Sequence, residues 1–437
     1  MSLLELSDVK VHFPVKKGVL FDRTVGHVYA VDGVSLKVEA GQTYGLVGES
    51  GCGKTTLGRG VLRLVDITDG EVVFDGTDLA KLPDEEMRRY RRRLQMVFQD
   101  PLGSLNPRQN IESILSEGMA AHGIGANQQE RRERIKEVLA KVGLPVNALS
   151  RYPHEFSGGQ RQRIGIARAL VLEPDVIICD EPVSALDVSV QAQVINLLEE
   201  LQKSLGLTYV VIAHDLAVVR HISDVIGVMY LGSLVEEAPS DALYAAPKHP
   251  YTKALMSAVP LPDPEAEDRR ERILLQGDLP SPANPPSGCR FHTRCPWAQP
   301  RCATDRPALV DTGDGHKVAC HFAAEIESGE LQPTRPTDIG AVTQTDAAVT
   351  EQPEEAVEAP AALLPADSTT KPDPGAVKEK MPATTEPAAD ATVEAEVAAE
   401  AKAAEAAPET ARDSEASDGT AEAAGPKGPG ASVDKAD

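Results

Sequence analysis

The sequence predicts an α/β fold built on a mostly parallel sheet. Three runs, at 43–47, 176–179 and 208–213, read as strands, and the continuous apolar run at 176–179 has the pattern of a strand buried on both faces. The first run leads through a glycine-rich turn into a helical pattern over 56–64. Because parallel strands end at one edge of a sheet, the residues that follow these runs are expected to meet there.

The glycine-rich turn has the composition of a phosphate-binding loop. Its glycines let successive backbone N–H groups point inward, and the following helix adds positive potential at its N-terminus. Lys54 is suited to the β- and γ-phosphates of a nucleotide, and the Thr55 hydroxyl is suited to Mg²⁺. The residues predicted to bind the nucleotide here are Gly48, Glu49, Ser50, Gly51, Cys52, Gly53, Lys54, Thr55 and Thr56.

Two carboxylates follow the run at 176–179, where an open α/β sheet places its ligands. Asp180 is predicted to hold Mg²⁺, directly or through water. Glu181 is predicted to polarise the attacking water, because phosphoryl transfer depends on positioning and on charge stabilisation. The sequence therefore predicts hydrolysis of a nucleotide as well as its binding.

The segment FSGGQRQR at 156–163 lies between the phosphate loop and the acid pair. This order of three elements resembles the ABC ATPase family, in which the signature segment covers the ATP held by a second subunit. The resemblance implies ATP, Mg²⁺ and a partner ATPase that binds head-to-tail. It also implies that four residues contact the partner's ATP, namely Ser157, Gly158, Gly159 and Gln160.

Smaller segments match the same family. Gln99 matches the glutamine loop that senses Mg²⁺ and water, Asp187 matches the loop that crosses to the partner, and His214 matches the switch histidine. The resemblance implies that Glu181, His214 and Gln99 are the catalytic residues. It implies that Thr55, Gln99 and Asp180 hold Mg²⁺.

One aromatic ring is expected to stack on the adenine. Phe13 lies where the family places that ring, and Tyr29 is the alternative. Stacking on a base requires an aromatic face more than a particular side chain, so either residue suits the role.

The hydrophobic pattern divides the chain into three parts. Residues 1–260 are predicted to form the nucleotide-binding domain, with a RecA-like core, an antiparallel β-subdomain and a helical subdomain at about 100–160. Residues 261–325 form a loop-rich extension. Residues 326–437 form an acidic tail rich in Ala, Glu and Pro, which is predicted to be disordered because it cannot bury enough apolar area.

Several elements of the first part have clear limits. Residues 72–74 are predicted to be a strand, and 128–142 and 194–205 are predicted to be amphipathic helices. Gly143 and Gly206 are the expected helix ends. A strand pair is expected around 228–236, with its turn at Gly232 and Ser233.

Segments after residue 245 narrow the resemblance. The runs HPYTKAL (249–255), GDLPSP (277–282) and PPSGCRFHTRCP (285–296) resemble the C-terminal extension of oligopeptide and dipeptide ABC importers. The phosphate loop and signature resemble the F-type of two paired ATPases. The resemblance implies an ATPase that powers import of di- or oligopeptides. Importers of nickel or oligosaccharides, and non-transport ABC ATPases, are the alternatives.

The same resemblance implies partners. These are a second, paralogous ABC ATPase, two integral-membrane permease subunits and an extracytoplasmic peptide-binding protein. The chain has no apolar run of the roughly 18 residues that span a bilayer, so it is expected to be peripheral at the cytoplasmic face of the inner membrane. The basic cluster at 88–93 lacks interleaved aromatic residues and is predicted to be a solvated helix face, with no nucleic acid as partner.

Four cysteines form a second chemical cluster, at Cys289, Cys295, Cys302 and Cys320. Cytosolic thiols stay reduced, and four of them in a proline-rich loop region indicate a metal clip. Their spacing lacks the close CxxC pairs of structural zinc and differs from common ferredoxin runs. Resemblance to the importer extension implies a [4Fe–4S] cluster, with zinc and unliganded thiols as the alternatives.

Overall fold

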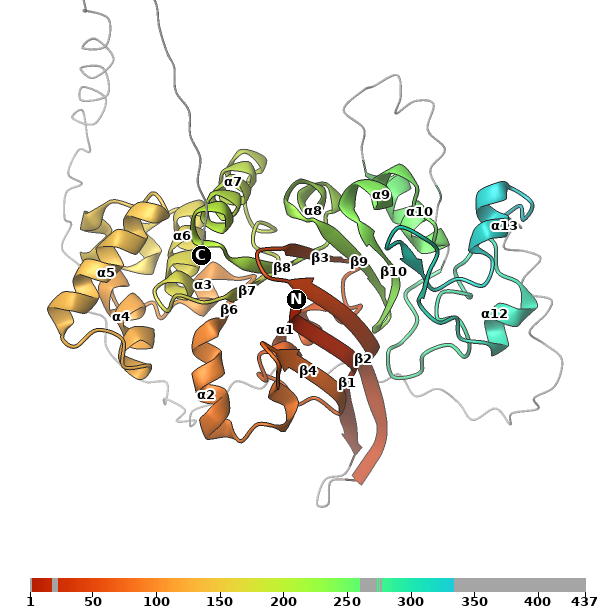
Figure 1. Cartoon of the computed structure of the whole chain (residues 1–437), viewed down its shortest axis with the longest axis horizontal. Helices are drawn as coiled ribbons and strands as arrows, with labels where there is room; N and C mark the ends of the chain where they lie inside the picture. The colour runs from red at the N-terminus through yellow and green to blue at the C-terminus, as the bar shows by residue number, and fades with distance from the viewer. Residues whose placement is uncertain (1, 18–22, 260–272, 274, 276, 334–437) are drawn as a thin grey trace, which may run out of the picture. The chain divides into compact units, whose positions relative to one another are not determined.

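The computed structural model describes residues 2–17, 23–259, 273, 275 and 277–333 (Figure 1). The predicted tail begins at 326, but its first residues belong to a short helix that starts at Ala323. The disorder predicted for the remainder concerns 334–437, which lies outside the described residues.

The strands of the larger sheet are β3 (Thr43–Val47), β6 (Leu94–Val97), β7 (Val176–Asp180), β8 (Thr208–Ala213), β9 (Val225–Tyr230), β10 (Ser233–Pro239), β11 (Val310–Asp311) and β12 (Lys317–Val318). They lie in the order β11-β12-β10-β9-β3-β8-β7-β6. From β9 to β6 every neighbouring pair is parallel, while β10, β12 and β11 add antiparallel strands. The predicted strands at 43–47, 176–179 and 208–213 are confirmed as β3, β7 and β8.

A second, antiparallel sheet forms the predicted β-subdomain. Its strands are β1 (Ser2–Lys17), β2 (Arg23–Glu39), β4 (Asp69–Phe74) and β5 (Thr77–Asp78), in the order β2-β1-β4-β5. The predicted strand at 72–74 is the end of β4. Apolar side chains of this sheet share one core with the helix after the phosphate loop and with the larger sheet, because Val11, Leu57 and Ile178 belong to one buried cluster.

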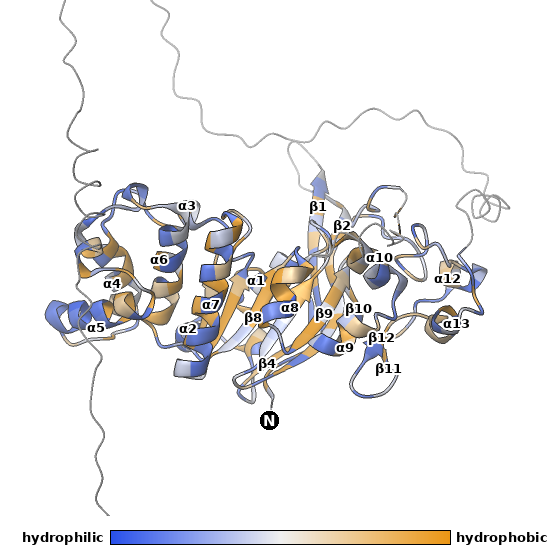
Figure 2. Cartoon of the chain, turned by 90° about the horizontal axis from the view of Figure 1, so that it is seen from above, coloured by the Kyte–Doolittle hydropathy of each residue, from blue (hydrophilic) through white to orange (hydrophobic). Residues whose placement is uncertain are grey.

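The helices are α1 (Lys54–Val61), α2 (Asp84–Arg93), α3 (Pro101–Ser104), α4 (Ile111–Ala121), α5 (Gln128–Lys141), α6 (Gly158–Leu170), α7 (Val188–Leu205), α8 (Leu216–Ile222), α9 (Ser240–Ala245), α10 (Pro250–Ala258), α12 (Pro300–Thr304) and α13 (Ala323–Ser328). Short 3₁₀ turns lie at Leu79–Lys81, Val146–Ser150 and Pro153–Glu155. Figure 2 colours the central strands as the most hydrophobic part of the ribbon, whereas α2 and α5 are mainly hydrophilic.

Helices α3 to α6 form the predicted helical subdomain. Ile135, Val138 and Leu139 of α5 are buried against the other helices, as the spacing predicts. Gly143 and Gly206 follow α5 and α7 with φ of 70° and 67°, a left-handed conformation that glycine adopts without strain. Both predicted helix ends are therefore confirmed.

The basic cluster at 88–93 lies on helix α2, but several of its side chains do more than face solvent. Arg88 donates to the carbonyl of Ala121, and Arg93 pairs with Asp175. These arginines tie α2 to the C-terminal end of α4 in the helical subdomain and to the residue just before β7.

The extension is continuous with the core sheet. β12 pairs with β10, where Glu236 lies opposite Val318 and Glu237 lies opposite Lys317. Phe291 of the extension is buried in the same cluster as Val47 at the end of β3. The predicted limit at residue 260 therefore does not divide two separate hydrophobic cores. The turn between β9 and β10 falls at Leu231 and Gly232, one residue earlier than expected.

Candidate functional site

The phosphate loop follows β3 and has a backbone that only glycine fits at two positions. Gly48 and Gly53 have φ of 154° and 105°. A Cβ on Gly48 would lie 2.1 Å from the carbonyl oxygen of Met229, and one on Gly53 would lie 2.0 Å from that of Ala30. The loop is therefore folded directly against the backbone of β9 and β2, with no space for a side chain.

Lys54 and Thr55 lie where α1 begins. The buried Lys54 Nζ donates to the carbonyl oxygens of Gly48 at 2.7 Å and Glu49 at 3.0 Å, so its ammonium lies inside the curve of the loop. Thr55 Oγ1 donates to Asp180 Oδ1 at 2.8 Å. The hydroxyl and the carboxylate predicted to hold Mg²⁺ are thus adjacent, although they lie 125 positions apart in the sequence.

Asp180 is the last residue of β7 and is buried. Burial raises the pKa of its carboxyl, and the hydrogen bond from Thr55 and the charge of Arg59 act in the opposite direction. A buried carboxylate beside a hydroxyl is an oxygen ligand set of the kind that Mg²⁺ takes, and a bound divalent cation would favour the charged form of that carboxylate.

Three predicted catalytic residues meet at the carboxyl edge of the sheet. Gln99 Nε2 donates to Glu181 Oε2 at 2.8 Å, and His214 Nδ1 lies 3.4 Å from the same oxygen. They come from β6, β7 and β8, whose carboxyl ends are neighbours in the sheet. Glu181 has a φ of 45°, a left-handed conformation that costs about 1 kcal/mol outside glycine. Its backbone N–H donates to the carbonyl of Ile212 at 2.9 Å, which holds it there.

The signature segment starts α6. Ser157 and Gln160 form a reciprocal capping box, each side chain bonding the other's backbone N–H. A Cβ on Gly159 would lie 2.4 Å from Val190 Cγ1, and one on Gly158 would lie 3.2 Å from Leu186. The signature therefore packs against the loop around Asp187, which precedes α7. Within the described residues, no hydrogen bond or ion pair joins it to the phosphate loop.

The two candidates for the adenine-stacking ring differ in surroundings. Phe13 lies on β1 opposite Val28, and 40% of it is exposed. Tyr29 is half-buried, packs edge-on against His12 with ring centroids 4.7 Å apart, and donates its backbone N–H to the carbonyl of Pro282. Phe13 thus offers the more accessible ring, and its role in stacking stays a prediction.

Glu49 makes contacts that the sequence did not indicate. Arg294 donates to both of its carboxylate oxygens, at 2.7 and 3.1 Å, and its backbone N–H donates to Tyr251 Oη at 2.8 Å. Sequence reasoning missed Arg294 and Tyr251, which lie 245 and 202 positions from Glu49. No local pattern links residues at such separations.

The four cysteines of the extension line one small cavity with Phe291. Burial raises the pKa of the Cys289 thiol and raises that of Cys320 to about 11, and the neighbouring Cys302 adds to both effects. However, among the described residues no group of three or more His, Cys, Asp or Glu is arranged to hold a metal ion. The expected [4Fe–4S] cluster therefore gains no support here, even though the thiols are gathered in one place.

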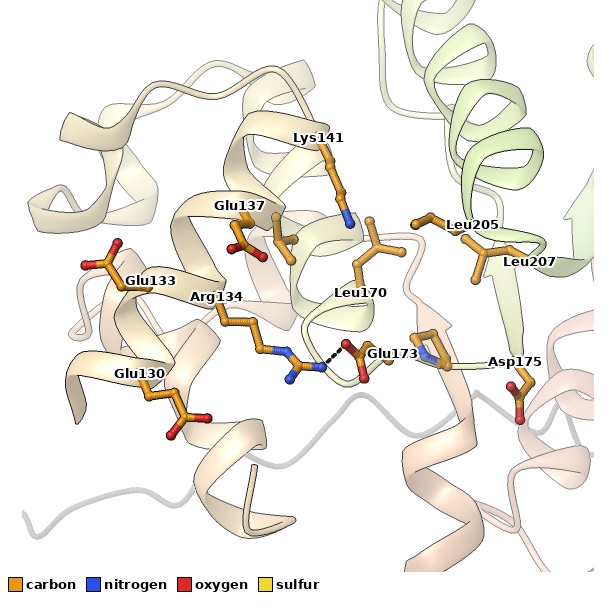
Figure 3. A pocket seen from close by; sticks show the side chains of 12 residues that line it. Glu130, Glu133, Arg134, Glu137, Lys141, Leu170, Glu173, Asp175, Leu205 and Leu207 are labelled. Carbon is orange, nitrogen blue, oxygen red and sulfur yellow. Dashed lines mark ion pairs between the residues drawn. The ribbon is translucent and has the colours of Figure 1, made fainter. Parts of the chain in front are cut away.

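A separate cavity of about 520 Å³ lies between α5, residues 173–175 and the end of α7 (Figure 3). Its lining is rich in acidic residues, and Arg134 of α5 forms an ion pair with Glu173. Residues 173–175 precede β7, so this cavity lies at the opposite end of the strand from Asp180 and Glu181. It contains none of the predicted nucleotide residues.

The described helices include none that is long and apolar enough to cross a membrane.

Two family models match the chain: "ABC transporter" over 31–184, and "Oligopeptide/dipeptide transporter, C-terminal region" over 235–302. The chain is 56% identical to the oligopeptide transport ATP-binding protein AppF of Bacillus subtilis, over 74% of this chain and 97% of AppF. It is also 56% identical to the OppF proteins of Salmonella typhimurium and Escherichia coli, over 73% of this chain and 95% of each.

These matches include the phosphate loop, the signature and the acid pair, all within the first model, and Cys289, Cys295 and Cys302 within the second. The relatives are covered almost completely, so the likeness concerns whole proteins rather than a shared motif. The chain belongs to the ABC transporter family of ATP-binding proteins, in the group that carries the oligopeptide/dipeptide C-terminal region.

Proposed function

We propose that this chain binds ATP with Mg²⁺ and hydrolyses it to power the import of di- or oligopeptides through an ABC transporter. The observation that carries the proposal is the meeting of Gln99, Glu181 and His214 at the edge of the sheet, beside Asp180 and the phosphate loop. This arrangement can position the attacking water and stabilise charge in the transition state, and phosphoryl transfer is catalysed mainly by these two effects. Membership of the oligopeptide group supports peptides as the cargo.

In this proposal each side chain has one role. Lys54 binds the β- and γ-phosphates, and Thr55 and Asp180 hold Mg²⁺, to which Gln99 adds an oxygen. Glu181 orients and polarises the attacking water, and His214 contacts the γ-phosphate. The hydrogen bond from Gln99 and the imidazole of His214, 3.4 Å from the same Glu181 oxygen, support this assignment, because they orient the carboxylate before a water arrives.

The signature acts in the partner's site. We propose that Ser157–Gln160 covers the ATP of a second, paralogous ATPase in a head-to-tail dimer, and that Asp187 lies at that interface. The position of the exposed Gly158 and the half-buried Gly159 at the N-terminus of α6 supports the proposal, because backbone N–H groups at a helix start favour an anionic ligand. The dimer docks under two permeases at the cytoplasmic face of the membrane and receives peptide from an extracytoplasmic binding protein.

Reconstitution tests this function. The chain is expressed with candidate permeases and a second ATPase, purified with them, and placed in liposomes with the binding protein. We expect ATP hydrolysis that increases when a peptide-loaded binding protein is added, and uptake of labelled peptide. Co-purification with ribosomes or DNA, and no response to any peptide, would count against transport.

We also propose that residues 261–325 serve as an extension of the ATPase domain at 1–260. In this proposal a metal centre bound by the four cysteines cross-links the loops of the extension. Their position around one cavity in a loop-rich region supports the proposal. Four thiolates are the ligands of both [4Fe–4S] clusters and structural zinc, and the group would supply structural cross-linking. Anaerobic purification followed by iron, sulfide and zinc analysis decides between them, and protein free of all three would reject the clip.

A further inference from the structure

All polar groups of Glu49 bond other groups of the protein, although Glu49 lies in the phosphate loop. Its carboxylate accepts two hydrogen bonds from Arg294, its N–H donates to Tyr251 Oη, and its carbonyl accepts from Lys54 Nζ. Two of these three partners come from the C-terminal part of the chain. Glu49 is therefore an anchor of the loop rather than a group directed at a ligand.

Arg294 is held in place for this contact. Its side chain is only 9% exposed, and its guanidinium lies 6.0 Å from the ring centroid of Tyr230. A guanidinium that meets a carboxylate with two parallel N–H···O bonds fixes orientation as well as distance, which an ammonium cannot do. The Arg294–Glu49 pair therefore fixes the direction of the Glu49 side chain, and with it the loop backbone.

Tyr251 gives the second anchor. It lies in the first turn of α10 and is fully buried. Its ring packs edge-on against Tyr230, with the ring centroids 4.8 Å apart, and in a tilted arrangement against Phe291, with the centroids 5.4 Å apart. Because the ring is fixed by these neighbours, its hydroxyl oxygen stays in position to accept from the Glu49 N–H.

The turn between β9 and β10 is hydrogen-bonded to the phosphate loop, and a residue of the extension is hydrogen-bonded to this turn. The N–H of Gly232 donates to the carbonyl of Cys52 at 2.9 Å. Arg290 donates to the carbonyl of Leu231 and to the Asp32 carboxylate. Arg290 and Arg294 flank Phe291, which lines the cysteine cavity. One short segment of the extension thus contacts both the phosphate loop and its support.

We propose that Arg294 and Tyr251 are positioning residues for ATP binding, which hold the phosphate loop in its curved shape through Glu49. This inference rests on the proposed ATPase function. A loop that must be ordered on binding loses affinity by the free energy of ordering, whereas a preorganised loop does not. Neither residue contacts Gln99, Glu181 or His214 in the described structure, so turnover of bound ATP is expected to be independent of them.

The test compares full-length variants by equilibrium binding of ATP with Mg²⁺ and by steady-state hydrolysis. Arg294→Gln is expected to weaken ATP binding about tenfold and to raise KM similarly with kcat almost unchanged, because a charge-assisted pair is lost. Arg294→Lys keeps the positive charge but loses the paired hydrogen bonds of the guanidinium. Its ATP affinity is therefore expected to lie between those of Arg294→Gln and the wild type. Tyr251→Phe removes one oxygen and is expected to weaken binding about threefold to fivefold.

Arg301→Gln is the matched control. Arg301 also pairs with a carboxylate of the extension, Asp305, but both side chains are at least half exposed and neither contacts the loop. Its ATP affinity is expected to equal that of the wild type. Glu49→Gln combined with Arg294→Gln is expected to bind ATP no more weakly than Arg294→Gln alone, because both changes break one pair.

Equal ATP affinity in Arg294→Gln and Arg301→Gln would overturn the inference. A fall in kcat with unchanged KM would overturn it too, because that pattern places the defect in chemistry. If Arg294→Gln does not fold, Tyr251→Phe carries the same test. A wild-type chain that binds no ATP would instead reject the proposed function, so the two failures are distinguishable.

Discussion

The phosphate loop and the cysteine loops are the two chemical clusters of this chain, and they are built in different ways. The phosphate loop is contiguous, and its shape is required by glycines at which a Cβ would lie about 2 Å from a neighbouring backbone oxygen. The four cysteines come from separated positions and share a cavity through packing in a region with few regular elements. We therefore expect changes of the reacting groups beside the phosphate loop to act on nucleotide chemistry, changes of the loop glycines to act on stability, and changes of the cysteines to act on stability with little effect on kcat.

Glu181→Gln tests whether the groups beside the phosphate loop act on nucleotide chemistry. Of all the changes considered, it is expected to have the largest effect, which is on the rate of ATP hydrolysis. It keeps the shape of the side chain and removes the charge that would polarise water, so hydrolysis is expected to fall by at least about 10²-fold. ATP binding should persist, because Lys54 and Thr55 are unchanged. Steady-state hydrolysis near the wild-type rate in the assembled transporter would contradict the assignment.

Gly53→Ala tests whether the loop shape is sterically required. The new Cβ would meet the Ala30 carbonyl at 2.0 Å in a left-handed backbone, so the free energy of unfolding is expected to fall by about 3 kcal/mol or more. Gly206→Ala is the control, since it is also left-handed but has nothing within 4 Å, and should cost about 1 kcal/mol. Chemical denaturation of both variants gives the comparison, and equal losses would contradict it.

His249 lies between the two clusters, because it lines the cysteine cavity and caps the helix that carries Tyr251. Burial lowers its pKa to about 4, against the opposing charge of Glu236. Between about pH 6.5 and pH 4 the unfolded chain therefore binds a proton that the folded chain does not. The free energy of unfolding is expected to fall over this range as pH falls, by up to about 3 kcal/mol.

His249→Asn is the matching variant, because asparagine also caps a helix N-terminus but does not titrate. Its free energy of unfolding should depend less steeply on pH between 6.5 and 4. Denaturant titrations at several pH values measure both slopes. Identical slopes would show that His249 does not make this contribution.

Cys302→Ser is expected to have the smallest effect on ATP turnover. It places a hydroxyl in a buried position beside the other thiols and removes one proposed metal ligand, which should lower the free energy of unfolding by at least about 1–2 kcal/mol. The kcat at saturating ATP should stay within about twofold of the wild type, because no reacting group is touched. A large loss of kcat in Cys302→Ser would contradict the expectation that changes of the cysteines leave ATP turnover intact.

The meeting of the predicted nucleotide residues at one edge of the sheet was predictable because regular strands bring them together. Asp180 and Glu181 follow a strand with an unbroken apolar run, and His214 follows its neighbour. The parallel order of β6, β7 and β8 then places their carboxyl ends side by side. Periodicity and glycine spacing are local signals, and each of these elements is long enough to show one.

The contacts of the extension were not predictable by the same reasoning. Arg294 and Glu49 lie 245 positions apart, and the segment around Arg294 has no helical or strand period. β12 has two residues, Lys317 and Val318, which is too short for an alternating pattern. The bonds of α2 to the end of α4 and to the residue before β7 were missed for a related reason, since a basic run predicts a solvated face unless the partners are known.

The pairing of β12 with β10 has a consequence for synthesis of the protein. Glu237 and Lys317 lie 80 positions apart, so a ribosome adding roughly 5–20 residues per second takes several seconds to deliver the strand that covers β10. During that interval the nascent chain exposes an open strand edge, which is a template for joining another chain. A protein cut at residue 260 would keep that edge open permanently, and should need a chaperone or low concentration to stay in solution.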